Sequence, residues 1–168
     1  TNGSVQVAID AIGSSSNSHI FLSITKEGRS AIFNSAGNGD CHVILRGGET
    51  PNYSKNHIDK VSKNLKDSNL IQKIMVDMSH GNSQKQFKKQ LLVNKDISDQ
   101  IASGNQNIFG VMIESNLEEG NQKIDSLKNL KYGQSVTDAC VSWKDTEVML
   151  KLLAKAVDSR RKKLKQSA

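Results

Sequence analysis

The sequence has few aromatic residues and no long apolar run, and each shortage excludes a class of protein. Aromatic side chains make up only 4% of the 168 residues, too few to provide stacking surfaces for bases. No apolar run approaches the roughly 20 residues that a membrane helix needs. The mean hydropathy of -0.50 is typical of a soluble protein. We therefore expect neither nucleic acid nor a membrane as a partner.

Cysteine is almost absent, since only Cys41 and Cys140 are present and they lie far apart in the sequence. They form no CxxC pair, so the pattern excludes a disulfide-rich secreted scaffold and favours a reducing compartment. The first ten residues, TNGSVQVAID, lack the basic-then-apolar pattern of a secretory signal. We therefore expect a cytoplasmic protein in which both cysteines are structural thiols rather than metal ligands.

The net charge of +6 at pH 7 is concentrated at one end of the chain. The last ten residues, SRRKKLKQSA, contain five basic residues and no acidic residue, so the rest of the chain is almost neutral. Basic residues at the end of a helix interact favourably with the negative end of its dipole. The tail is therefore interpreted as a solvated helix end rather than as a nucleic-acid-binding surface.

Apolar periodicity predicts alternating strands and helices, preceded by one helix and a hairpin. We expect helices over residues 4–12, about 54–66, about 83–103 and about 142–163, the second capped by Asn52 or Ser54. We expect strands over residues 20–25, 30–34, 41–45, 74–76 and 108–113, the first two joined by a turn at 26–29. The last helix is predicted to bury one stripe: Val148, Met149, Leu152, Leu153, Ala156 and Val157.

Three polar groups follow the three later strands at equal spacing. Arg46 and His80 are 34 residues apart, and so are His80 and Glu114. Each strand is an unbroken apolar run, as is typical of parallel strands buried on both faces, and a βα unit takes about 30 residues or more. Parallel strands end at the same edge of a sheet. We therefore expect these groups to meet at the edge where α/β proteins build their sites.

The length leaves two architectures open. A closed (β/α)8 barrel takes about 250 residues, whereas this chain supplies three such strands, a hairpin and a leading helix. The chain is therefore either a small open α/β sheet or less than half of a barrel.

His80, Glu114 and Asp138 are candidate metal ligands. Asp138 lies in the segment SVTDAC, just before the last predicted helix. One imidazole and two carboxylates suit Mn, Fe, Co or Zn. The alternative is that His80 is an ordinary loop histidine and that the two acids are helix-start residues. Spacing alone leaves both interpretations open.

Arg46 stands directly before two glycines and is a candidate anion-binding group. A guanidinium beside glycines, whose backbone N–H groups a ligand can approach, suits phosphate or carboxylate. An ion pair between Arg46 and a neighbouring acid is the alternative. Lys85, Lys88 and Lys89 are expected on a solvated helix face. No G-x-S-x-G, P-loop or G-x-G-x-x-G motif is present.

Several segments together resemble type I DAHP synthase, also called 3-deoxy-D-arabino-heptulosonate 7-phosphate synthase or phospho-2-dehydro-3-deoxyheptonate aldolase. They are CHVILRGG, PNYS, MVDMSHGNSQKQFKKQ, GVMIESNLEEGNQ, LKYGQSVTDAC, the hairpin IFLSITKEGRSAIFNSAGN and the final RR. The resemblance covers essentially the whole chain, and it corresponds to the C-terminal part of the family's chain.

The resemblance implies a fold and an activity. It implies that residues 1–168 are the C-terminal portion of a single (β/α)8 TIM-barrel domain, with a regulatory β-hairpin inserted at residues 19–35. The family condenses phosphoenolpyruvate with erythrose 4-phosphate, releases phosphate and requires a divalent metal ion. This is the first step of the shikimate pathway, it is inhibited by an aromatic amino acid, and we expect the intact enzyme to be a dimer or tetramer.

The resemblance also assigns roles to individual residues. His80, Glu114 and Asp138 match the family's metal ligands, and Arg46 matches a ligand of the phosphoenolpyruvate phosphate. In the implied reaction, His80, Asp138 and Arg46 are the catalytic residues, and Arg46 and His80 also bind substrate. Asp138 is expected to orient or deprotonate water.

Phe21, Ser23 and Phe33 occupy positions of the family's feedback site. The chain also departs from the family. The family's cysteine metal ligand and several of its phosphate-binding basic residues lie upstream of the matching segments, and they are absent from this sequence. It also has Gly81 where alanine is usual and starts with Thr-Asn-Gly instead of Thr-Asp-Gly. Two alternatives follow: the chain is a catalytically incomplete fragment, or it is an effector-binding module without catalysis.

Overall fold

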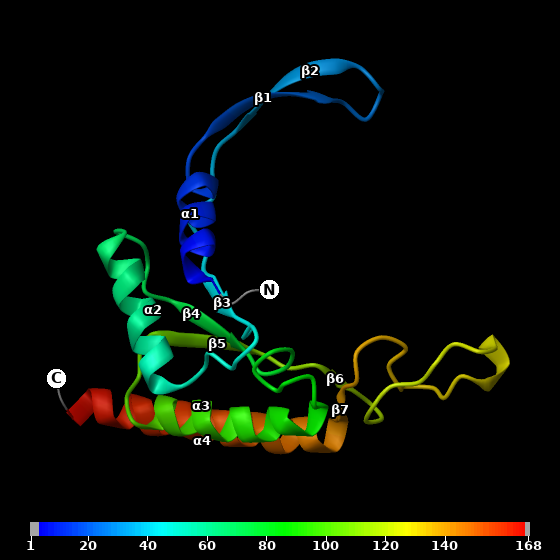
Figure 1. The fold of residues 1–168 in the computed structure, drawn as a ribbon. Coiled ribbons are helices and arrows are strands. Elements are labelled where there is room, and N and C mark those ends of the chain that lie inside the picture. The colour runs from blue at the N-terminus through cyan, green and yellow to red at the C-terminus, as the bar shows by residue number, and fades with distance from the viewer. Residues whose placement is uncertain (1–3, 167–168) are drawn as a thin grey trace.

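A three-stranded parallel sheet lies at the centre of the computed structural model, which describes residues 4–166 (Figure 1). The sheet has the order β3 (Val43–Leu45), β4 (Ile74–Asp77) and β5 (Ile108–Met112). The helices α2 (Lys55–Asp67) and α3 (Gln90–Ala102) connect these strands in turn. This strand–helix alternation confirms the predicted α/β class.

The remaining elements flank this unit. Before it lie α1 (Val5–Ser15), β1 (His19–Ile24) and β2 (Ser30–Ser35), and after it lie β6 (Ser115–Asn116), β7 (Val141–Ser142) and α4 (Trp143–Gln166). Two short 3-10 helices are η1 (Phe87–Lys89) and η2 (Leu127–Asn129). The β6–β7 pair is parallel and was not predicted, because two-residue strands carry no periodicity.

One face of the sheet packs against helices. The buried strand residues on this side are Val43, Leu45, Ile74, Val76 and Ile108, and their helical partners in the core include Ile58, Leu65, Val93, Ile97 and Met149. Burying each such side chain contributes about 1.5–3 kcal/mol before the loss of chain entropy. In Figure 1, α3 and α4 lie side by side along this sheet.

The other face of the sheet is not covered by residues 4–166. Ile44 on β3 is 44% exposed and Met112 on β5 is 38% exposed. The prediction that the strands are buried on both faces is therefore wrong for the described residues. Alternate strand residues point to opposite faces, and the helices of this chain cover only one of them.

The hairpin β1–β2 extends away from the sheet (Figure 1). Its strands are antiparallel, and Phe21 faces Phe33 in the register. The two rings stack with centroids 5.9 Å apart and an interplanar angle of 15°. Ser23 shares their face of the ribbon, because side chains two positions apart along a strand point the same way.

Most predicted elements are present, and two of them have different bounds. The third predicted helix begins at Gln90 rather than at residue 83, because Gln84 and Lys85 have left-handed backbones with φ of 54° and 59°. The strand predicted from Cys41 begins at Val43, so Cys41 precedes it. Smaller differences affect the first helix, which continues through Gly13 to Ser15.

The predicted stripe of the last helix is only partly buried. Met149 and Ala156 are buried, but Val148 is 58% exposed and Leu152 is 37% exposed. No helix within residues 4–166 is long and apolar enough to cross a membrane. Residues 1–3, where the chain reads Thr-Asn-Gly, lie outside the described residues.

Candidate active site

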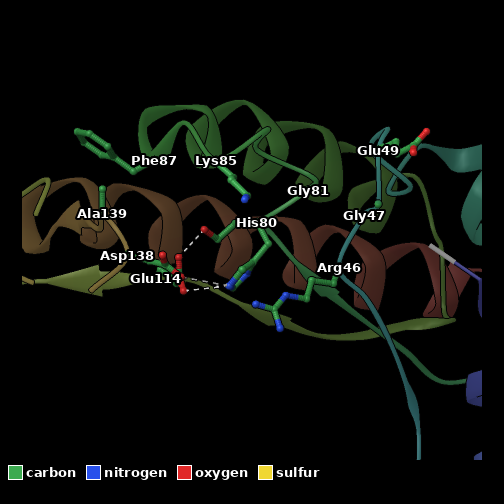
Figure 2. A pocket seen from close by; sticks show the side chains of 12 residues that line it. Arg46, Gly47, Glu49, His80, Gly81, Lys85, Phe87, Glu114, Asp138 and Ala139 are labelled. Carbon is green, nitrogen blue, oxygen red and sulfur yellow. Dashed lines mark hydrogen bonds and ion pairs between the residues drawn. The ribbon is translucent and has the colours of Figure 1, made fainter. Parts of the chain in front are cut away.

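A cavity of about 510 Å³ lies at the C-terminal edge of the parallel sheet (Figure 2). Arg46 follows β3, His80 follows β4 and Glu114 follows β5, and all three line this cavity. The predicted convergence of these three groups is confirmed. Asp138, which precedes β7, lines the same cavity.

His80 presents one ring nitrogen to two carboxylates. Its Nδ1 atom lies 2.8 Å from Asp77 Oδ2, and because a carboxylate can only accept, Nδ1 carries the proton. The other nitrogen, Nε2, lies 3.2 Å from Glu114 Oε1 and 3.8 Å from Asp138 Oδ2. The Nε2 atom and two acidic oxygens therefore face one another.

This donor set fits a divalent cation. One ligand atom from each of His80, Glu114 and Asp138 lies within 4.8 Å of the others. The two carboxylates attract a cation, and the imidazole nitrogen beside them can contribute a lone pair to it. An imidazole nitrogen with two carboxylate oxygens suits Mn, Fe, Co or Zn. Asp138 is 74% exposed, which leaves room for further ligands.

Asp77 and Ser79 hold these groups in place. The Asp77 side chain is 1% exposed, accepts the Ser79 backbone N–H at 2.9 Å and contacts His80. The Ser79 hydroxyl donates to Glu114 Oε2 at 2.6 Å. Arg46 Nε lies 3.8 Å from Asp77 Oδ2, so an ion pair with a neighbouring acid, the predicted alternative for Arg46, is also present. Ligand orientation by such partners is usual at metal sites.

Gln90, at the start of α3, fixes Glu114 from behind. Its side-chain Nε2 donates to the Glu114 carbonyl at 3.1 Å, and its Oε1 accepts the Glu114 N–H at 2.9 Å. Gln90 is fully buried. No local pattern predicts this contact, because it joins a helix to a strand end 24 residues away.

Asn82 joins the ends of two strands. Its side-chain Nδ2 donates to the carbonyls of Leu45, 3.0 Å away, and Asp77, 2.8 Å away. Its Oδ1 accepts the Asn52 N–H at 2.8 Å. Leu45 and Asp77 are the last residues of β3 and β4, so Asn82 fixes the spacing of the strands that carry Arg46 and His80.

The loops after β3 and β4 are in close contact. Gly47 has φ of 76°, and a Cβ atom added to it would lie 2.6 Å from the Gly81 carbonyl carbon. A Cβ added to Gly81 would lie 2.8 Å from the Gly48 nitrogen. Glycine at these positions therefore allows the segment that carries Arg46 to lie directly against the His80 loop.

The remaining candidates differ in position. Lys85 lines the cavity and lies in a turn, so its assignment to a solvated helix face is wrong. Lys88 and Lys89 are in η1. Burial raises the pKa of the Cys140 thiol, which agrees with a structural rather than a ligand role. Cys41 and Cys140 are both free thiols.

These features define a class of protein: an α/β chain that carries a metal-type donor set and an arginine at the C-terminal edge of a parallel sheet. Residues 2–151 match the DAHP synthetase I family, and the chain belongs to that family. The assignment agrees with the resemblance seen in the sequence.

Individual relatives are similar over nearly the whole chain. The Phe-sensitive phospho-2-dehydro-3-deoxyheptonate aldolase of Escherichia coli K12 is 53% identical over 161 residues, covering 96% of this chain and 46% of the relative. The Trp-sensitive enzyme of Salmonella typhimurium LT2 is 49% identical, and the match covers 95% of this chain and 46% of the relative. A protein of Schizosaccharomyces pombe named as a putative phospho-2-dehydro-3-deoxyheptonate aldolase is 48% identical, and the match covers 96% of this chain and 45% of the relative.

A solved structure shares the fold. The phospho-2-dehydro-3-deoxyheptonate aldolase of Francisella tularensis SCHU S4 has a TM-score of 0.90 and 54% identity, covering 95% of this chain and 47% of that one. The chain therefore spans about half the length of the relatives it matches. The matched half corresponds to their C-terminal part.

Proposed function

We propose that this chain supplies the C-terminal half of the active site of a DAHP synthase. The reaction joins phosphoenolpyruvate to erythrose 4-phosphate and releases phosphate, the first step of aromatic amino acid biosynthesis. The observation that carries the proposal is the meeting of His80, Glu114, Asp138 and Arg46 around one cavity. Two free thiols support a cytoplasmic location.

We further propose that residues 1–168 are part of a single (β/α)8 barrel whose remaining strands correspond to the part of the relatives that these residues do not cover. The uncovered sheet face with Ile44 and Met112 supports this, because the interior of a barrel is filled by such side chains. Without that region the chain would be a catalytically incomplete fragment, which is the main alternative.

His80, Glu114 and Asp138 would hold the divalent metal ion in this enzyme. The ion supplies Lewis-acid polarisation of the aldehyde oxygen of erythrose 4-phosphate. The Asp77 carboxylate accepts a hydrogen bond from His80 Nδ1, so Nε2 is the ring nitrogen that is available to bind the ion. Ser79 and Gln90 keep the Glu114 carboxylate and backbone in position.

The chain's other groups act on the second substrate and on water. C3 of phosphoenolpyruvate attacks the aldehyde carbon, water adds at C2, and phosphate leaves from the resulting tetrahedral carbon. Arg46 binds the phosphate and stabilises its charge as it leaves. Asp138, exposed at the cavity mouth, orients or deprotonates the water.

The hairpin is proposed as part of a feedback site for an aromatic amino acid. The stacked rings of Phe21 and Phe33 share one face with Ser23, which gives an apolar surface beside a hydroxyl. Phe- and Trp-sensitive relatives support this role. Exposed Ile20 and Leu22 on the opposite face support assembly into a homo-oligomer.

The first experiment is an intact mass of the purified protein under denaturing conditions, combined with an assay for phosphate release from the two substrates. Activity that accompanies a longer or companion polypeptide would support the proposal. An 18.4 kDa species without activity, alone in the sample, would show a fragment with an incomplete site. Binding of an aromatic amino acid without metal binding would favour an effector module.

Replacing Arg46 with alanine in the intact enzyme is expected to raise the KM for phosphoenolpyruvate by about 10- to 100-fold, because a charge-assisted phosphate contact is lost. Arg161→Ala, on the exposed end of α4, is the matched control and should leave KM unchanged. Steady-state kinetics with phosphoenolpyruvate varied would measure both. An unchanged KM in Arg46→Ala would contradict the phosphate role.

Replacing Gln90 with alanine is expected to weaken binding of a divalent metal by about 10- to 100-fold, as is usual when a group that orients a ligand is removed. The side chain itself touches no proposed donor atom and acts through the Glu114 backbone. Gln106→Ala, exposed just before β5 at the far end of the sheet, is the control. Calorimetric titration with Mn²⁺ would measure the change, and equal affinities would reject the positioning role.

A further inference from the structure

Asp138 is held differently from the other two proposed metal donors. His80 and Glu114 follow neighbouring strands of the central sheet, and the Ser79 hydroxyl donates a hydrogen bond that ties their segments together. Asp138 instead lies in a long connection between β6 and β7, residues 117–140, which extends away from the sheet in Figure 1. The position of the Asp138 carboxylate therefore depends on the contacts that fasten this connection to the rest of the protein.

The two ends of the connection are bonded to each other beside Asp138. The Gly120 N–H donates to the Cys140 carbonyl at 2.8 Å, and the Cys140 N–H donates to the Gly120 carbonyl at 3.1 Å. The Asn121 side chain donates to the Thr137 carbonyl at 2.8 Å. Because Thr137 and Cys140 lie on either side of Asp138, a contact that fixes the segment around Gly120 also fixes Asp138.

Lys88 joins this connection to the segment that follows His80. Its ammonium forms an ion pair and a hydrogen bond with Glu119, the residue before Gly120. It also donates to Asp145 Oδ2 at 3.1 Å, and Asp145 lies in the first turn of α4, directly after β7. Lys88 itself lies in η1, between β4 and α3. One ammonium therefore links the start of the connection, the helix beyond its end and the chain after His80.

The charge of Lys88 suits this linking role. Its hydrogen bonds with Glu119 and then with Asp145 raise the pKa of Lys88 above its ordinary value, so the ammonium is charged at neutral pH. The side chain is half-exposed, and water and salt screen each of its ion pairs. Exposed pairs are individually weak, but a network in which one cation holds two acids from different segments is the arrangement in which they matter.

We propose that Lys88 is a positioning residue for the metal ligand Asp138. By fixing Glu119 and Asp145, it keeps the connection, and with it the Asp138 carboxylate, in place beside the other two donors. The ammonium contacts Glu119 and Asp145 rather than a donor residue, so it acts through them. The proposal rests on the proposed function, in which Asp138 helps to bind a divalent metal ion.

The sign of the effect separates positioning from simple electrostatics. An ammonium near the site repels a divalent cation, and removing it would also leave the carboxylates of Glu119 and Asp145 unpaired and able to attract one. By charge alone, Lys88→Gln would therefore bind a divalent ion more tightly than the parent. If Lys88 positions Asp138, the same substitution binds the ion more weakly.

Calorimetric titration of the intact protein with Mn²⁺ measures this difference. Lys88→Gln is expected to bind Mn²⁺ about 3- to 10-fold more weakly than the parent, which is the range that two exposed ion pairs can supply. Lys88→Arg keeps the charge and should restore most of the affinity. Lys95→Gln is the matched control and should bind as the parent does, because Lys95 pairs with Asp99 within the single helix α3.

Two further measurements test whether Lys88 acts through the connection. Hydrogen exchange of the metal-free protein should be faster in Lys88→Gln at the amides of residues 118–122 and 138–141, and unchanged in α3. The double variant Lys88→Gln/Glu119→Gln should bind Mn²⁺ as Lys88→Gln does, because the first substitution already breaks this pair.

The outcomes distinguish the role of Lys88 from the proposed function. If the parent binds Mn²⁺ and Lys88→Gln binds it equally or more tightly, the role of Lys88 is wrong and the metal site stands. An equal loss of affinity in Lys95→Gln would also overturn the role of Lys88. If the parent binds no Mn²⁺, both are wrong. If Lys88→Gln binds more weakly but the parent releases no phosphate from the two substrates, the role of Lys88 holds and the reaction is wrong.

Discussion

Replacing His80 with alanine is expected to reduce kcat/KM by about a thousandfold or more, together with a large loss of affinity for divalent metal. Lewis-acid assistance is worth several kcal/mol, and each 1.4 kcal/mol corresponds to about a tenfold change in rate. His80 Nε2 is the only nitrogen among the three converging donor groups. Without it, two carboxylates remain, 28% and 74% exposed, and these suit weakly bound hard cations better than Zn or Fe.

The measurement combines metal content of the purified protein, calorimetric titration with Mn²⁺, and kinetics at saturating metal. His57→Ala is a matched control, because His57 is an exposed histidine whose Nδ1 contacts the hydroxyl of Ser54, away from the cavity. Metal content and activity of His57→Ala should equal those of the parent. If His80→Ala kept its metal and its rate, His80 would be an ordinary loop histidine.

A stability measurement separates the two roles of His80. The imidazole also covers the buried Asp77 carboxylate, so its removal is expected to cost about 1–3 kcal/mol of unfolding free energy. Asp77 retains the Ser79 N–H, which limits this loss. A variant that remains folded but has lost its metal would attribute the fall in rate to the missing ligand.

The spacing of polar groups was enough to predict where the site lies. Arg46, His80 and Glu114 follow successive parallel strands, and strand direction alone brings such residues to one edge. Asp138 was predicted from its residue type and the family resemblance, and it joins the set through the loop that leads to β7. The site is therefore largely a consequence of βα periodicity.

The supporting contacts could not be predicted in the same way. Gln90 and Asn82 act through hydrogen bonds to the backbone of distant segments, and any polar residue at a helix start has the same local pattern. The turn at Gln84 and Lys85 was mistaken for helix, because polar residues between apolar ones fit a helical period as well as a turn. Propensity does not reveal such strain, since tertiary contacts impose it.

The uncovered sheet face was also not predicted. An unbroken apolar run indicates that a strand is buried in its complete fold, but not which part of the chain covers it. Ile44 and Met112 have apolar side chains of the kind found in protein cores, but they are as exposed as surface residues. This mismatch is what a sheet shows when one of its packing layers lies outside the described residues.

Replacing Asn82 with alanine is expected to destabilise the protein by about 3 kcal/mol or more. The side chain is 3% exposed and makes three hydrogen bonds, all to backbone groups. Its removal takes one hydrogen-bond partner from each of two carbonyls and one N–H, at about 1–3 kcal/mol for each group that is left unsatisfied where water cannot reach it. Since whole domains are stable by only about 5–15 kcal/mol, this is a large fraction.

Urea unfolding of the intact protein would measure this loss, with Asn56→Ala on the exposed side of α2 as the control. Asn82→Asp tests the mechanism, because aspartate has the same shape but cannot donate to the carbonyls of Leu45 and Asp77. It should be at least as destabilising as alanine, since a carboxylate would face two carbonyl oxygens. A loss below about 1 kcal/mol in both variants would mean that water or relaxation replaces these bonds.

The same substitution connects stability to function. Leu45 and Asp77 directly precede the segments that carry Arg46 and His80, so loosening their strand ends changes the separation of the proposed phosphate and metal groups. A misplacement of about 1 Å can cost about 100-fold in rate. Asn82→Ala is therefore expected to lower kcat even below its unfolding temperature, where a purely global loss of stability would leave the folded enzyme fully active.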